Sequence, residues 1–165
     1  MKRSRPSQIL LTLFRVLFTL LALWTLWFIF RNSLESGAIS SAHSQAVTNT
    51  LNRMLSQIGI HPLTNAVVRK LAHFGEYCLL GFACTLCLRV YTRHYIRHVS
   101  WPLLLGLLVA TADETLQRLF ASGRDGSFQD VWLDFIGCSC GMLCAVCLLL
   151  ILTLVGMAIR PHRRQ

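Results

Sequence analysis

Charged residues are scarce in this chain. Only 14% of its 165 residues are charged and 54% are hydrophobic, whereas about a quarter of the residues in a typical soluble domain are charged. This composition excludes an ordinary water-soluble globular protein. The length suits one domain, and four membrane spans of about 20 residues each would take up roughly half of it. We therefore expect no separate soluble catalytic domain.

Acidic residues and known catalytic motifs are also scarce. Seven acidic residues stand against 16 Lys and Arg, which leaves a formal net charge of +9. The basic residues lie at the ends of apolar runs, so we predict contacts with membrane lipids and no nucleic-acid partner. The sequence contains no nucleotide-binding loop, nucleophile elbow or His-Glu-x-x-His zinc motif. Enzyme status stays open and no cofactor is identified.

Four long apolar runs predict an all-α, polytopic membrane protein with a single domain. At 1.5 Å per residue, a run of about 20 residues crosses the 30 Å hydrocarbon core. No small-residue cleavage site follows the first run, so we interpret it as a retained signal anchor. The predicted spans are residues 10–30, 71–90, 101–120 and 131–157, between a basic N-terminus (1–9) and a basic tail (158–165).

The connection 31–70 contains a predicted amphipathic helix. Its apolar residues recur at spacings of three to five, which is typical of one helix face, and Gly59 and Pro62 mark its end; the residues are Ala46, Val47, Leu51, Met54, Leu55 and Ile58. We expect it to lie on the membrane surface or to cap the bundle. From the basic residues at both termini and around residues 89–97, we expect these parts to lie in the cytoplasm by the positive-inside rule.

The acidic groups gather at one predicted level of the bilayer. All of them except Glu35 fall within residues 76–134. Spans two and four run inward and carry Glu76, Asp130 and Asp134 near their starts, whereas span three runs outward and carries Asp113 and Glu114 near its end. These groups therefore share the outer third of the membrane, where charge is costly and usually functional.

Helical spacing brings further polar groups to this level. Lys70, His73, Glu76 and Tyr77 share one face. Asp113 is four residues from Gln117, and Asp130 is four from Asp134, on a face that continues into the small-residue seam Gly137-x-x-x-Gly141. Arg124 lies in the loop between spans three and four, where it could hold a phosphate or carboxylate bidentately.

These motifs together resemble the VanZ-like family over about residues 31–157. The resemblance lies in Arg69 to Tyr77, in Asp113-Glu114-x-x-Gln117, in Arg124 with Ser127 and Asp130, and in Gly137-x-x-x-Gly141. The family pattern more often has Asn where this chain has Asp134. The resemblance implies a small bacterial membrane protein, and some family members are linked to resistance to the glycopeptide teicoplanin. It implies no settled catalytic mechanism.

Each candidate residue has a functional and a structural interpretation. His73, Glu76, Asp113 and Glu114 are the candidates for acid–base catalysis or for binding a divalent cation, with the metal itself unknown. The candidates for ligand binding are Lys70, Tyr77, Gln117, Arg124, Asp130 and Asp134. Structurally, Glu114 could pair with Arg118, Asp130 could be an N-cap, and Tyr77 could be an interfacial anchor.

Three function classes follow. The leading one is a site for an anionic ligand derived from the cell envelope, such as a lipid headgroup or phosphate. The second is a noncatalytic membrane-interaction protein whose buried charges fix helix packing. The third is a transporter or proton relay, which would need a homo-oligomer because four spans are few for a pathway.

Overall fold

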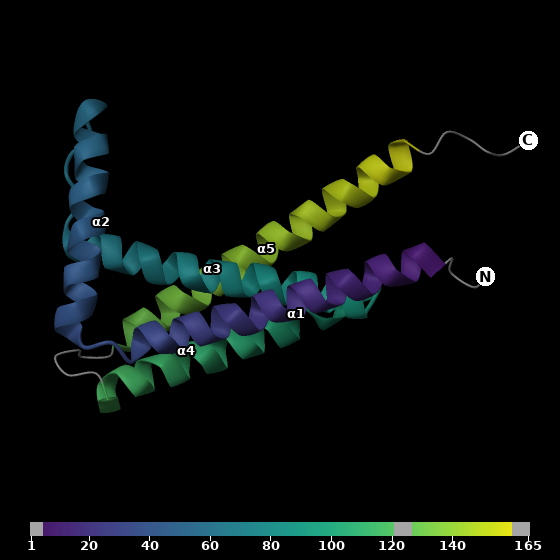
Figure 1. The fold of residues 1–165 in the computed structure, drawn as a ribbon, viewed down its shortest axis with the longest axis horizontal. Helices are drawn as coiled ribbons and strands as arrows, with labels where there is room; N and C mark the ends of the chain where they lie inside the picture. Colours follow the sequence, from purple (N-terminus) through teal and green to yellow (C-terminus); the bar gives the residue numbers. More distant parts are fainter. Residues whose placement is uncertain (1–4, 121–126, 160–165) are drawn as a thin grey trace, which may run out of the picture.

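A computed structural model describes residues 5–120 and 127–159, with side chains from Ser7 onward. This part of the chain is almost entirely helical (Figure 1). Arg124 and the basic residues Lys2, Arg3, Arg160, Arg163 and Arg164 lie outside the described residues. The elements are α1 (Arg5–Ser33), α2 (Gly37–Gln57), α3 (Asn65–Tyr91), the 3₁₀ helix η1 (Tyr95–His98), α4 (Ser100–Phe120) and α5 (Phe128–Ala158).

Four stretches of the described chain are long and apolar enough to cross a bilayer, which confirms the predicted all-α membrane fold. They correspond to α1, α3, η1 with α4, and α5. Their outward faces carry large exposed apolar side chains such as Leu20, Leu108 and Leu152, which suit contact with lipid tails. The helices run past the predicted spans: α3 begins at Asn65, not Leu71, and α5 begins at Phe128, not Val131.

Glycines bring α3 and α5 into close contact where the two helices cross (Figure 1). A Cβ atom at Gly141 would overlap the backbone carbonyl of Cys78, and one at Gly137 would lie 2.6 Å from the carbonyl oxygen of Phe74. On α3, Gly81 packs in the same way against Cys138. This contact is the predicted small-residue seam, and it fixes the register between α3 and α5.

The α2 helix lies crosswise at one end of the bundle (Figure 1). It ends in a Schellman motif at Gly59, which has a φ of +72°, as Gly59 N–H bonds to Ser56 O and Ile60 N–H to Leu55 O. The side chain of Asn52 pairs with both backbone groups of Leu63, so the link to α3 folds back along α2. The predicted amphipathic helix is therefore present, and it is longer than its apolar pattern.

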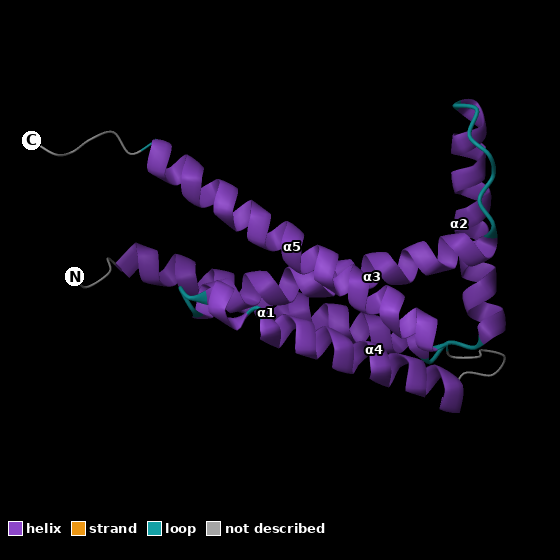
Figure 2. Cartoon of the chain, turned by 180° about the vertical axis from the view of Figure 1, so that it is seen from behind, coloured by secondary structure: helices purple, strands orange, loops and turns teal. Residues whose placement is uncertain are grey.

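The two ends of the bundle differ in what they contain. The start of α1, the end of α5 and η1 lie at one end, which we call the terminal end, while α2, the end of α4 and the start of α5 lie at the opposite end, the α2 end (Figure 2). At the terminal end Arg15 is not simply directed outward, because its Nε donates to the Val90 carbonyl at 3.1 Å. Which end faces the cytoplasm stays a prediction.

Candidate functional site

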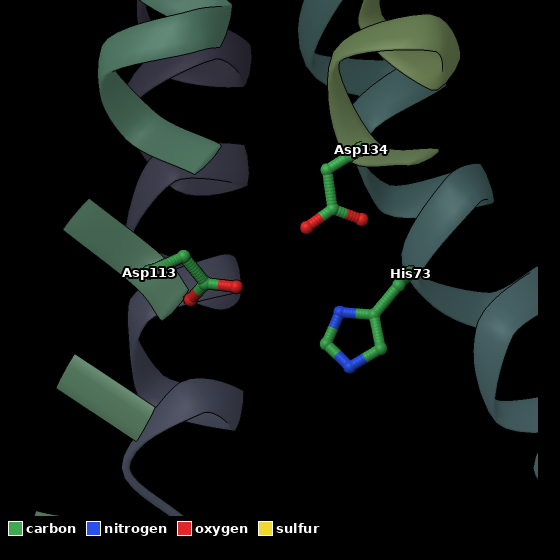
Figure 3. Close-up of side chains that lie close together, drawn as sticks. All are labelled: His73, Asp113 and Asp134. Atoms are coloured by element: carbon green, nitrogen blue, oxygen red, sulfur yellow. The ribbon is translucent and has the colours of Figure 1, made fainter. Parts of the chain in front are cut away.

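Three side chains from three helices converge near the α2 end. His73 of α3, Asp113 of α4 and Asp134 of α5 each offer one ligand atom, and these atoms all lie within 4.8 Å of one another. Figure 3 shows the two carboxylates and the imidazole directed into one space. They meet because α3 and α5 start at this end and α4 finishes there. We call these three residues the triad.

The triad carboxylates are deeply buried. Asp113 is 0% exposed and Asp134 is 1% exposed, while His73 is half-buried. Asp134 Oδ1 has no hydrogen-bond partner among the described residues. A buried carboxylate oxygen without a donor is unusual in a folded protein and calls for a specific explanation.

Neighbouring groups hold Asp113 in place. Gln117 Nε2 donates to Asp113 Oδ2 at 3.1 Å, one turn along α4. The Ser33 hydroxyl at the end of α1 donates to the Asp113 backbone carbonyl at 3.3 Å. Gln117 therefore helps to position the Asp113 side chain. Gln117 is itself buried, with 6% of its surface exposed. Such contacts fix the direction in which a carboxylate points.

Tyr77 is a core residue and not an interfacial anchor. Its side chain is completely buried, one turn after His73 on α3. The phenol lies within electrostatic reach of Asp113 and Asp134. It therefore closes the apolar side of the triad, between the polar groups and the core formed by residues such as Leu80 and Ala110.

Glu114 and Asp130 contact the ends of other helices. Glu114 Oε2 accepts the backbone N–H of Ser127 at 2.9 Å, which ties the end of α4 to the start of α5. The N-cap of α5 is Ser127 and not Asp130, because the Ser127 hydroxyl accepts the N–H of Gln129. Asp130 instead pairs with Lys70 at 2.9 Å. This pair is solvent-exposed, so it contributes little to stability.

A cavity of about 410 Å³ borders the triad on the side of α1 and α2. His73 and Glu76 of α3 line it together with Arg69, and α1 contributes Arg31. Asn32 Nδ2 donates to Glu76 Oε1 at 3.0 Å within the lining. We call this space the α2-end cavity. His73 belongs to the triad and also lines the cavity.

The sequence interpretation had not assigned Arg31, Asn32 and Arg69 to the site. A local signal existed for Arg69, because it precedes His73 by four residues and thus shares its helix face. For Arg31 and Asn32 no local signal exists, since their place in the lining depends on how α1 packs against α3. Of the ten predicted site residues, Lys70 and Asp130 pair with each other near the surface and are not members of the triad.

Comparison with known proteins supports the resemblance noted from the motifs. No curated protein and no solved structure is significantly similar to this chain. A family model described as VanZ/LLP1 matches residues 16–152, which include the two middle spans in full, most of the first and last spans, and the whole triad. The chain therefore belongs to the VanZ/LLP1 family.

Proposed function

We propose that this membrane protein binds an anionic ligand of the cell envelope, a phosphate-bearing lipid headgroup, in the α2-end cavity. The observation that carries the proposal is the pair of guanidinium groups on the lining. Arg31 and Arg69 are exposed toward the cavity region and have no carboxylate partner among the described residues. An exposed arginine without a carboxylate partner is suited to bidentate contact with phosphate.

Within the part of the chain that the structure describes, the carboxylates of the lining form no ion pair with these arginines. Glu35 lies 3.4 Å from His43, and Glu76 accepts a hydrogen bond from Asn32. The guanidinium groups of Arg31 and Arg69 thus remain available to an incoming anion. Arg31 also lies 5.6 Å from the Trp27 ring, which orients its planar group.

The surroundings of the cavity favour a lipid over a free anion. Val47 of α2 and Phe28 of α1 line the cavity beside the arginines. The apolar face of α2 remains largely exposed, with Val47 at 52%, Met54 at 60% and Ile58 at 69%. A helix of this kind lies at the boundary between headgroups and acyl chains. A lipid there could place its phosphate near Arg69 and its tail beside the apolar residues.

Arginine substitutions test this proposal. Purified protein in nanodiscs of phosphatidylglycerol should show a higher melting temperature than in phosphatidylcholine, and Arg31→Gln and Arg69→Gln should remove most of the difference. Arg53→Gln, which removes the same charge from an exposed site on α2 outside the cavity, should keep it. Equal lipid dependence in all four proteins would overturn the proposal. Stabilisation by inorganic phosphate alone would identify a free anion as the ligand.

Family membership supports a physiological extension, that ligand binding here contributes to glycopeptide resistance. Expression in a susceptible bacterium should raise the inhibitory concentration of teicoplanin, and the Arg69→Gln variant should not. An unchanged inhibitory concentration with the wild-type protein at normal membrane levels would contradict this extension and leave lipid binding standing.

One observation favours the alternative of a noncatalytic scaffold. Glu114 and the Lys70–Asp130 pair contact other helices, as a packing role requires. That alternative expects every substitution in the polar region to reduce folding. A well-folded Arg69→Gln protein that has lost its lipid preference would exclude it.

A further inference from the structure

We propose that His73, Asp113 and Asp134 bind one divalent metal ion of the Zn²⁺ or Mn²⁺ class. The site is distinct from the arginine lining of the α2-end cavity, although His73 borders both. The metal proposal therefore extends the proposed function and stands even if the cavity binds no lipid.

The geometry suits one ion after a small adjustment. Ligand atoms about 2.0–2.2 Å from a common ion lie about 3–3.5 Å from each other. The three atoms of the triad already lie within 4.8 Å of one another, so rotation of the side chains would bring them to bonding distance.

Burial supplies an independent observation. Asp134 is 1% exposed, and its Oδ1 has no hydrogen-bond partner among the described residues. Its carboxyl group is directed toward His73 and Asp113 (Figure 3). Two carboxylates held together away from water favour a bound cation, because one divalent ion compensates both charges.

The helices around the triad form a rigid frame. Gly137 lies one turn after Asp134 and packs against the backbone of Phe74, the neighbour of His73. On α4, Asp113 accepts a hydrogen bond from Gln117 of the same helix through its side chain and from Ser33 of α1 through its backbone carbonyl. The ligands are thus held by packed backbone and by hydrogen bonds, as metal sites in proteins generally are.

The donor set narrows the choice of metal. One imidazole and two carboxylates suit Zn²⁺ or Mn²⁺, whereas soft ions such as Cu⁺ prefer thiolates. Three protein ligands leave at least one coordination position open. Because His73 also lines the cavity, an anionic ligand there could occupy that position.

Metal binding can be measured directly on the full-length protein. After treatment with EDTA, equilibrium dialysis of the detergent-solubilised protein against Mn²⁺ or Zn²⁺ should give one bound ion per chain. His73→Ala and Asp134→Asn should each weaken binding at least tenfold. Asp130→Asn is the matched control, since it makes the same change four residues earlier on α5 at an exposed position, and it should bind like the wild type.

A spectroscopic measurement keeps the proposal falsifiable if a variant fails to fold. Pulsed EPR of Mn²⁺ bound to the wild type should show coupling to one imidazole nitrogen. Absence of that coupling, absence of saturable binding by the wild type, or equal loss of binding in Asp130→Asn would each overturn the proposal. Arg69→Gln should retain the bound ion, which separates failure of this site from failure of lipid binding.

Discussion

The two ends of the bundle contain spaces of similar size that are lined differently. At the terminal end, a groove of about 510 Å³ lies between α1, α3 and α5 and is lined mainly by apolar residues such as Phe14, Phe18 and Leu148, with Arg89 among them. At the α2 end, the cavity of about 410 Å³ is lined by arginines, carboxylates and His73. A membrane protein keeps buried polar groups only where they have partners or a use. This contrast supports our proposal that the ligand binds at the α2 end.

The largest expected effect comes from a change in the glycine seam between α3 and α5, which lies between the two ends of the bundle. Gly141→Val would drive a side chain into the backbone of Cys78, so we expect destabilisation of about 3 kcal/mol or more, at the upper end of overpacking costs. Gly156→Val on the same helix is the control, because nothing lies within 4 Å of its Cβ position. Thermal unfolding in detergent measures both. Similar melting temperatures would show that the two helices are not held by this seam.

An intermediate effect, on metal affinity, is expected from a change at Gln117, which donates a hydrogen bond to Asp113 of the triad. Gln117→Ala removes the donor to Asp113 Oδ2. Loss of such an orienting contact lowers metal affinity by about 10- to 100-fold, which Mn²⁺ titration would detect. Thr111→Ala, at an exposed position on α4, should leave the affinity unchanged. An unchanged affinity in Gln117→Ala would mean that Asp113 needs no support to bind the ion.

The smallest effect is expected at the exposed ion pair. Lys70→Gln breaks the contact with Asp130, where the side chains are 53% and 30% exposed. Exposed pairs contribute about 0–1 kcal/mol, and salt screens them. Unfolding at low and high ionic strength should therefore show a slight loss of stability that disappears with salt. A decrease of more than about 2 kcal/mol in the free energy of unfolding would mean that Lys70 belongs to a buried network and not to an exposed surface pair.

Local patterns in the sequence predicted much of this architecture. Apolar length identified the spans, helix direction placed the acidic groups at one level, and spacing of four paired Asp113 with Gln117. The Ser127-x-x-Asp130 spacing is itself a capping signal, and it would have indicated Ser127 as the N-cap. These features depend on neighbours along one helix, so the chain encodes them locally.

Other features depend on tertiary packing and have no local signal. The crosswise direction of α2 and the arrival of Arg31 and Asn32 beside α3 follow from contacts between distant segments. The hydrogen bond that the Ser127 N–H donates to Glu114 depends on how the start of α5 packs beside the end of α4. An arginine near a membrane boundary is equally compatible with a topology signal and a binding site, so its sequence position did not indicate that Arg31 lines the cavity.

The central claim is that the α2 end holds a preformed polar site centred on the triad. Thermal unfolding of the wild type, Asp134→Asn and Asp130→Asn, with and without Zn²⁺, tests it most directly. Without metal, Asp134→Asn should be as stable as the wild type or more stable, because it removes a buried charge. With Zn²⁺ at about 100 times its dissociation constant, the wild type and Asp130→Asn should gain about 2.7 kcal/mol and become more stable than Asp134→Asn. An equal response to Zn²⁺ in all three proteins would contradict the account.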